Sequence, residues 1–231
     1  RIALEYFNKH VGLCHTMIVM SATKAEQSIL AKDPFAVAIR AEGKIIVDKD
    51  NFKGKILSIP NIEIESNVEE KVYRKIYTGN MKHTMAAFMG KAKGYDFMNE
   101  CYNDSEISKF INEAYWEAEY AVQEEFNFPE DDRKKWNEIM MNLNNKNLKD
   151  TITRVAFNLK KKQSKTNRFI GPALLCLKHN KLPYFLSLGI AYGYAYLDEK
   201  DNESIEVHQY IRDNGIRSAI LHFSSLTEKD W

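Results

Sequence analysis

The sequence predicts a mainly α-helical protein in which a short strand-rich segment precedes a multi-helical domain. Two observations support this prediction. Up to about residue 66, apolar residues form short β-branched runs, whereas from residue 67 onward they recur at helical intervals. The 231 residues are enough for a helical domain of roughly 160 residues with its own core. We therefore expect two parts, residues 1–66 and residues 67–231.

The first part contains four short apolar runs that read as strands. Glycine-containing or charged connectors separate them, and Pro60 ends the last one. The runs are residues 17–20, 35–39, 45–47 and 56–59.

The second part opens with a helix for which Asn67 is a candidate N-cap and Glu70 its capping-box partner. Gly79 is a possible irregularity within this helix. Ser105 is a candidate cap for a later helix, and Gly215 is a natural C-cap for the last one. The further helices are predicted at residues 105–125, 131–143, 167–180, 183–197 and 204–214.

Composition excludes several classes of protein. The net charge of +1, from 33 basic and 32 acidic residues, predicts neither a nucleic-acid partner nor an anionic membrane surface. No apolar run approaches the roughly 18–20 residues of a membrane span. The three cysteines are far apart and form no metal or disulfide pattern, which favours reduced thiols in a cytoplasmic protein and no metal site.

Lys75, Asn80 and His83 are the most informative residues. At about 100° per residue, Asn80 and His83 lie roughly 60° apart on a helix, and Lys75 lies roughly 140° from Asn80. All three can therefore face one cleft, more easily if Gly79 loosens the turn between them. A lysine base, an amide donor to a developing alkoxide and an imidazole that holds a hydroxyl suit metal-independent oxidation of an alcohol.

A basic run from Lys160 to Arg168, preceded by Arg154, is the densest positive patch in the chain. Such a run is often only a solvated loop. Its other interpretation is recognition of a substrate phosphate, because arginine offers bidentate geometry and lysine a point charge. Arg154, Arg168 and Lys162 are the candidate substrate-binding residues.

The ten glycines contain no G-x-G-x-x-G spacing, the usual cradle of a nicotinamide dinucleotide. The pairs Gly90/Gly94 and Gly189/Gly193 are more typical of close helix packing. If the chain takes part in hydride transfer, its cofactor-binding residues must lie upstream. The start at Arg1 rather than at methionine fits that expectation.

Several segments resemble the mannitol dehydrogenase family, the long-chain, metal-independent polyol dehydrogenases. The segment 74–83 followed by 86–90 resembles the opening of the family's helical domain. Segments 150–155, 167–171 and 188–191 are similar to the mannitol-1-phosphate 5-dehydrogenase branch. The likeness covers most of residues 67–221.

The resemblance implies a 6-phosphogluconate dehydrogenase C-terminal-like fold after a remnant of a Rossmann-type domain. It also implies NAD as cofactor, Lys75 as general base, Asn80 as oxyanion donor and His83 as a substrate hydroxyl ligand. The substrate would be a polyol or sugar phosphate, and the chain alone is expected to be inactive. The sequence departs from the family pattern at Thr16, Met17 and Lys82.

Two alternatives remain open at this point. A hexuronate reductase of the same superfamily would carry similar residues, and anion placement should separate it from a polyol-phosphate enzyme. A non-catalytic helical module that binds a partner would explain the missing cofactor motif equally well.

Overall fold

The structure is a computed structural model that describes residues 45–48, 62–65, 68–142, 150–227 and 230. The chain divides into two compact units, residues 1–71 and residues 72–231. The described part of the first unit contains a parallel pair of strands, β1 (Ile45–Asp48) and β2 (Ile62–Glu65), with Ile45 opposite Ile62. β1 confirms the strand predicted at residues 45–47. β2 was not predicted, although its Ile-Glu-Ile-Glu alternation is typical of a strand.

The other three predicted strands, the candidate cap Asn67, and the departures at Thr16 and Met17 lie outside the described residues.

A helical rod begins at Val68, at the end of the first unit, continues through the start of the second, and changes its winding part-way. α4 (Val68–Lys75) runs into a π-helical turn, η1 (Ile76–Asn80), which continues as α5 (Met81–Ala92). The Met81 N–H donates to the Ile76 carbonyl five residues back, the pattern of a π-turn. The irregularity expected at Gly79 is therefore real, and its form is a π-turn.

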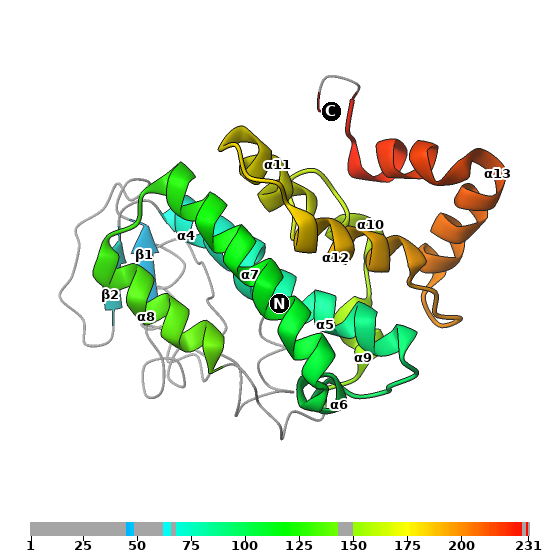
Figure 1. The fold of residues 1–231 in the computed structure, drawn as a ribbon, viewed down its shortest axis with the longest axis horizontal. Helices are drawn as coiled ribbons and strands as arrows, with labels where there is room; N and C mark the ends of the chain where they lie inside the picture. Colours follow the sequence, from blue (N-terminus) through cyan, green and yellow to red (C-terminus); the bar gives the residue numbers. More distant parts are fainter. Residues whose placement is uncertain (1–44, 49–61, 66–67, 143–149, 228–229, 231) are drawn as a thin grey trace, which may run out of the picture. The chain divides into compact units, whose positions relative to one another are not determined.

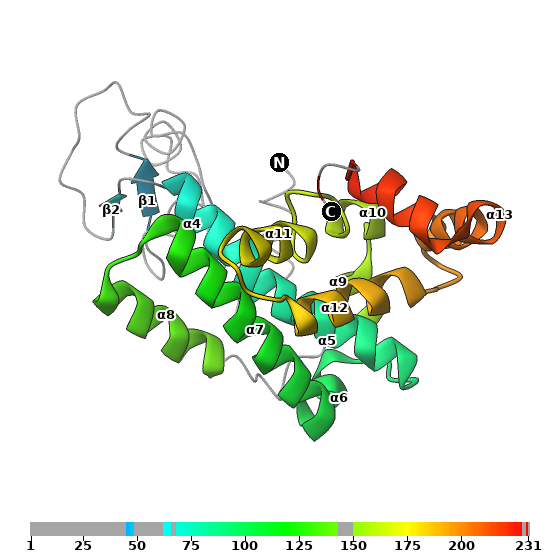
Figure 2. The ribbon, with the colours of Figure 1, turned by 45° about the horizontal axis from the view of Figure 1, so that its top comes forward.

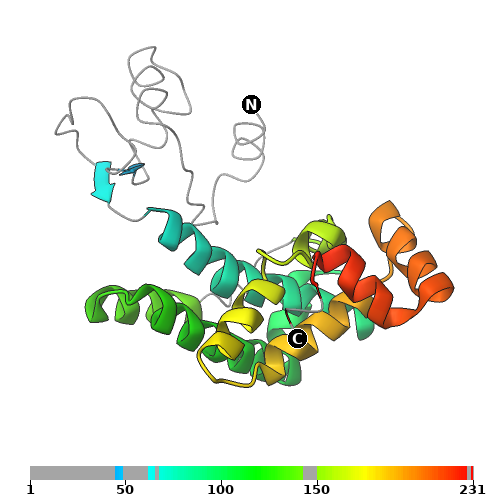
Figure 3. The same cartoon turned by 90° about the horizontal axis from the view of Figure 1, so that it is seen from above.

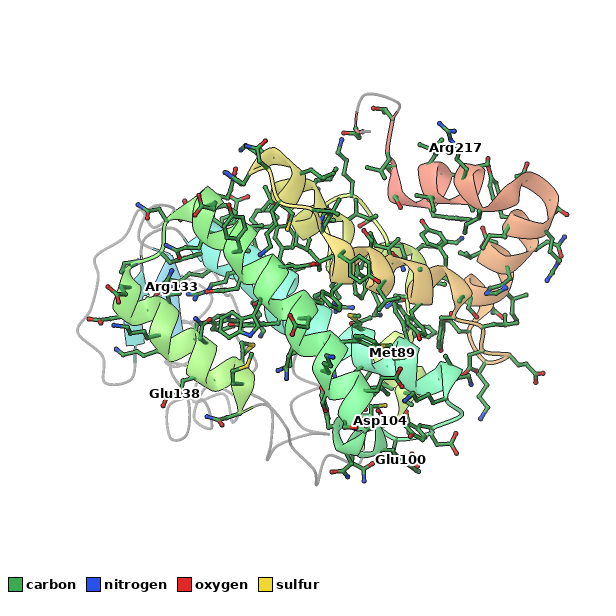
Figure 4. The ribbon with its side chains drawn as sticks, in the orientation of Figure 1. Met89, Glu100, Asp104, Arg133, Glu138 and Arg217 are labelled. Atoms are coloured by element: carbon green, nitrogen blue, oxygen red, sulfur yellow. The ribbon has the colours of Figure 1, made fainter. Side chains whose placement is uncertain are left out.

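Two helices cross the rod on one side. α6 (Met98–Asn103) is a short helix that leads into the long α7 (Ser105–Phe126). The N-cap of α7 is Asp104, whose carboxylate accepts from the Glu106 and Ile107 N–H groups, so the prediction of Ser105 as the cap was wrong by one residue. Figure 4 labels Asp104 and Glu100 at this α6–α7 junction.

The remaining helices complete the bundle. They are α8 (Glu130–Met141), α9 (Ile152–Ala156), α10 (Leu159–Lys162), α11 (Ile170–Lys178), α12 (Tyr184–Ala195) and α13 (Asn202–Ser224). α13 breaks at Gly215, where φ is +80°, so the predicted end of a helix at this glycine is confirmed and a further helical stretch follows it. The short helices α6, α9 and α10 were not predicted.

α5 forms the centre of the bundle. It packs against α6, α7, α9 and α12, and almost every residue from Met81 to Gly90 is buried. Figures 1 and 2 show α7 running along this rod with α8 beside it, and Figure 3 shows α13 next to α12, far from α8. The mainly helical class predicted from the sequence is confirmed.

Of the two predicted packing pairs, Gly90, Gly189 and Gly193 serve close packing, whereas Gly94 does not: its φ is +80° and an added Cβ would meet no atom within 4 Å. A Cβ atom on Gly90 would lie 2.2 Å from the Cys101 sulfur, and one on Gly193 would lie 1.5 Å from the Gln163 side-chain nitrogen. Such distances leave room only for hydrogen. Among the described helices, none is long and apolar enough to cross a membrane.

Candidate functional site

Lys75 and Asn80 lie at the two ends of the π-turn. Lys75 is the last residue of α4, Asn80 is the last residue of η1, and both are half-buried. Because a π-turn closes a hydrogen bond between residues five apart, it brings such residues closer to one face than an α-helix does. The π-turn thus favours convergence of Lys75 and Asn80.

The opposite face of the π-turn is fixed in the core. Tyr77 and Thr78 are buried, and the Trp136 indole N–H donates to the Thr78 hydroxyl at 3.1 Å. The Thr78 hydroxyl donates in turn to the Arg74 carbonyl at 2.7 Å, which satisfies an acceptor in the widened turn. These contacts hold the turn, so the backbone that carries Lys75 and Asn80 is rigid.

A buried ion pair anchors the residue before Lys75. Arg74 donates to Glu119 of α7 at 2.8 Å, and both side chains are only 5% exposed. The guanidinium also lies over the rings of Phe128 and Trp136, at 4.7 and 5.2 Å from their centroids. Burial raises the pKa of Glu119, an effect that Arg74 opposes. Arg74 is therefore a structural cation that faces the core.

His83, in the first turn of α5, is held by a neighbour that the sequence analysis did not single out. Its Nδ1 lies 2.5 Å from the Tyr102 hydroxyl of α6, and the two rings are stacked. Its Nε2 lies 4.0 Å from an oxygen of Asp150, and a third of the side chain remains exposed. Burial lowers the pKa of His83 to about 4, against the effect of Asp150 and with help from Arg154 and Arg168. The imidazole is therefore neutral at pH 7.

Asp150 is a second residue that was missed as part of the site. Its carboxylate is bound by the Arg154 guanidinium one helical turn later, at the start of α9. The backbone around Asp150 is tied to the entrance of α6, because Met98 N–H donates to Asp150 O and Ile152 N–H donates to Asp96 O, each at 2.9 Å. Tyr102 and Asp150 thus belong to one connected support for His83.

The basic run divides into two groups. Lys160 pairs with Glu206 at 2.5 Å and Lys165 pairs with Asp230 at 2.6 Å, so these two lysines are structural. Lys162 instead turns inward and is only 6% exposed. Its ammonium makes no hydrogen bond or ion pair with any residue that the structure describes. The interpretation of the whole run as a solvated loop is therefore wrong for Lys162.

Arg168 connects Lys162 to His83. Its positive charge acts on both groups: it lowers the pKa of His83, and after burial it is the next cause that lowers the pKa of Lys162, to about 7. The Arg168 Nε is buried without a partner among the described residues. Burial lowers the pKa of Arg168 to about 10, still well above neutral. Among the predicted residues, Arg154 and Arg168 thus act electrostatically on His83, and Arg168 also acts on Lys162.

The Asp201 and Glu203 carboxylates act on Lys162 in the opposite direction, but burial and Arg168 outweigh them. Buried cations without a hydrogen-bonded partner are costly, so this arrangement suits an anionic ligand group. Among the described residues, no cluster of histidine, cysteine, aspartate and glutamate could hold a metal ion.

Comparison with known proteins gives independent evidence on the family. Residues 67–225 match the family model described as the mannitol dehydrogenase C-terminal domain. The chain belongs to the mannitol dehydrogenase family. The family membership inferred from segments 74–83, 150–155 and 167–171 is therefore confirmed.

Two of the curated relatives within the family are named mannitol-1-phosphate 5-dehydrogenase. The one from Buchnera aphidicola subsp. Acyrthosiphon pisum (strain 5A) is 30% identical over 224 residues, which cover 96% of this chain and 57% of the relative. The one from Thermoanaerobacter pseudethanolicus is 26% identical, with 97% and 58% covered. The chain therefore spans less than two thirds of the length of these relatives.

Among solved structures, a D-sorbitol dehydrogenase in substrate-free form is similar, with a TM-score of 0.48 and 17% identity. The match covers 73% of this chain and 44% of that one.

Lys82 is a departure from the family pattern that the structure explains. It is 3% exposed and donates to the Met140 carbonyl at 2.7 Å, at the C-terminal end of α8. The ammonium lies 5.7 Å from the centroid of the Tyr115 ring, and burial lowers its pKa to about 8. A cation at a helix C-terminus is favourable. Lys82 thus joins α5 to α8.

Proposed function

We propose that this chain is the substrate-binding part of an NAD-dependent polyol-phosphate dehydrogenase that interconverts mannitol 1-phosphate and a ketose phosphate. The observation that carries the proposal is the pair of buried, like-charged side chains Lys162 and Arg168, with Arg168 Nε unpartnered among the described residues and Arg168 also acting on the neutral imidazole of His83. A polyol phosphate offers hydroxyl groups for the imidazole and an anion for the cations. The names of the relatives support this choice of substrate.

Each candidate site residue of the chain has its own role in the proposed reaction. The Lys75 amine acts as general base and removes the proton of the reacting hydroxyl, while Asn80 donates a hydrogen bond to the oxygen as its negative charge develops. His83 holds a hydroxyl of the substrate, and Lys162 and Arg168 bind the phosphate. Arg154, the third candidate substrate-binding residue, is held by its ion pair with Asp150. In the reductive direction, Lys75 returns the proton to the ketose oxygen.

NAD, when bound, accepts the hydride that leaves the carbon. The glycines of this chain lack the G-x-G-x-x-G spacing of a dinucleotide cradle. We therefore place the dinucleotide on a Rossmann-type domain upstream of this chain, in the same protein.

An assay of the full-length protein with NAD(H) tests the proposal. The substrates are mannitol 1-phosphate, mannitol, fructose 6-phosphate and a hexuronate. We expect kcat/KM for the phosphorylated compounds to exceed that for mannitol by about 100-fold or more, because charge-assisted hydrogen bonds contribute about 1.5–3 kcal/mol each. Turnover of the hexuronate alone would identify the reductase instead, and turnover of none would favour the non-catalytic module.

Matched variants test the phosphate subsite. Lys162→Met and Arg168→Met should each lower kcat/KM for mannitol 1-phosphate by at least about 10-fold and leave that for mannitol nearly unchanged. Lys160→Met and Lys165→Met, from the same basic run, should change neither value, because their ammonium groups pair with Glu206 and Asp230. Equal losses of kcat/KM for both substrates would show that the phosphate does not bind at Lys162 and Arg168.

A further inference from the structure

The contact between the Tyr102 hydroxyl and His83 Nδ1 bears on which ring nitrogen of His83 carries the hydrogen. A neutral imidazole has one N–H donor and one acceptor nitrogen. Nδ1 faces the Tyr102 hydroxyl, which can donate or accept, and Nε2 faces the Asp150 carboxylate, which accepts only. A lone pair on Nε2 would face that carboxylate unfavourably. The arrangement therefore favours a hydrogen on Nε2, with Nδ1 accepting from the tyrosine.

We propose that Tyr102 is a positioning residue for His83: its hydroxyl donates to Nδ1 and so fixes the imidazole as an Nε2–H donor toward the substrate. The inference rests on the proposed function for its catalytic consequence, but the tautomer itself does not. With Nε2–H as donor beside the Asp150 acceptor, the site recognises a group that both accepts and donates, which is a hydroxyl. A ketone or carboxylate at this point would leave Asp150 facing another acceptor.

The position of Tyr102 follows from how α6 packs on α5. Gly90 lies seven residues after His83, two turns along the same face of α5. The absence of a side chain at Gly90 lets Cys101 of α6 and Ile152 of α9 approach α5 closely, since an added Cβ would lie 2.2 and 2.9 Å from their side chains. Tyr102 follows Cys101 directly and thereby reaches the imidazole.

The other charged groups that act on His83 leave this assignment intact. Arg154 is bound to Asp150, and Arg168 disfavours protonation of the imidazole. The depressed pKa, about 4, keeps His83 neutral through the working range, so the tautomer rather than the charge decides what the imidazole offers.

Nitrogen-15 NMR of histidine-labelled full-length protein tests the proposal. The His83 signal is assigned by its loss in His83→Gln. In the wild type at pH 7 we expect the Nε2–H tautomer, and in Tyr102→Phe a mixture with Nδ1–H and an easier protonation on acidification, because a hydrogen bond to the neutral form is lost. A wild-type spectrum with hydrogen on Nδ1 overturns the proposal, even if Tyr102→Phe does not fold.

Steady-state kinetics test whether the contact between Tyr102 and His83 affects turnover. Tyr102→Phe should lower kcat/KM for the polyol substrate by about 5- to 30-fold without raising the KM for NAD. Tyr95→Phe is the matched control, since it removes a tyrosine hydroxyl bound to Asp104 at 2.9 Å that does not touch His83. An unchanged tautomer and kcat/KM in Tyr102→Phe refutes the proposal while the proposed function stands. If the wild type turns over no polyol, the proposed function fails and the NMR result still decides the role of Tyr102.

Discussion

The basic run around Lys162 shows how neighbouring side chains of one type take different roles. Lys160 and Lys165 have carboxylate partners, whereas Lys162 lies inside with Arg168 as a like-charged neighbour. The sequence placed all of these cations in one patch, but it contained no sign of which would turn inward. That choice depends on Glu206 and Asp230, which are 40 residues or more away in the chain.

The proposed phosphate subsite should depend on pH through Lys162. Its pKa in the folded protein is lowered from 10.5 to about 7, so its charge is present below pH 7 and is lost as the pH rises through that value. We expect the KM for mannitol 1-phosphate to rise between about pH 7 and pH 9, with the KM for mannitol flat over the same range. Lys162→Met should remove this difference in steady-state assays. The same rise for both substrates would contradict the assignment.

Tyr102 and Asp150 were not predicted because their signals are weak. Tyr102 lies on a helix of six residues, too short for a periodic pattern, and Asp150 only joins the site through the backbone bridge to α6. Lys75, Asn80 and His83 were found because their types and spacing suit one chemistry. Their convergence remains a prediction that the π-turn supports.

The helices of the bundle also divide into those that the sequence predicted and those that it did not. The long, periodic helices α7, α8, α11 and α12 were predicted to within a few residues of their ends, and so was the part of α13 before Gly215, whereas its stretch after Gly215 was not predicted. The helices α6, α9 and α10 have at most six residues and little periodicity. The π-turn could be anticipated only as an irregularity at Gly79. Its widening depends on tertiary contacts with Trp136 and Met140 of α8.

Gly90 provides a test of the close contact among α5, α6 and α9. Gly90→Ala should lower the free energy of unfolding by about 1–3 kcal/mol through overpacking, in excess of the roughly 1 kcal/mol that alanine gains over glycine in a helix. Urea denaturation of the full-length protein measures this change.

Cys101→Ala serves as the matched partner. It removes the sulfur that the new methyl group would meet at 2.2 Å and leaves the Cys101 Cβ at an ordinary 3.7 Å. The double variant should therefore be more stable than the sum of the two single changes predicts, by about 1 kcal/mol. Strict additivity would show that α6 does not approach α5 as closely as described.

At the scale of the whole protein, the proposed reaction needs more than this chain. It spans about 57% of the length of its relatives, and the cofactor motif that hydride transfer needs is absent from its glycine pattern. The described strands β1 and β2 belong to the first unit, and their assignment to the end of a Rossmann-type domain stays a prediction, as does the inactivity of the chain alone. The function proposed here is therefore a property of the full-length protein.

Single-turnover oxidation of mannitol 1-phosphate by full-length protein, followed by the absorbance of NADH, tests the central claim most directly. Lys75→Ala removes the proposed base, so the hydride-transfer rate should fall by at least about 100-fold while the affinity for NAD stays within twofold of the wild type. Lys71→Ala, a neighbouring lysine one turn earlier, serves as the control and should keep the wild-type rate. Hydride transfer at the wild-type rate in Lys75→Ala would contradict the account.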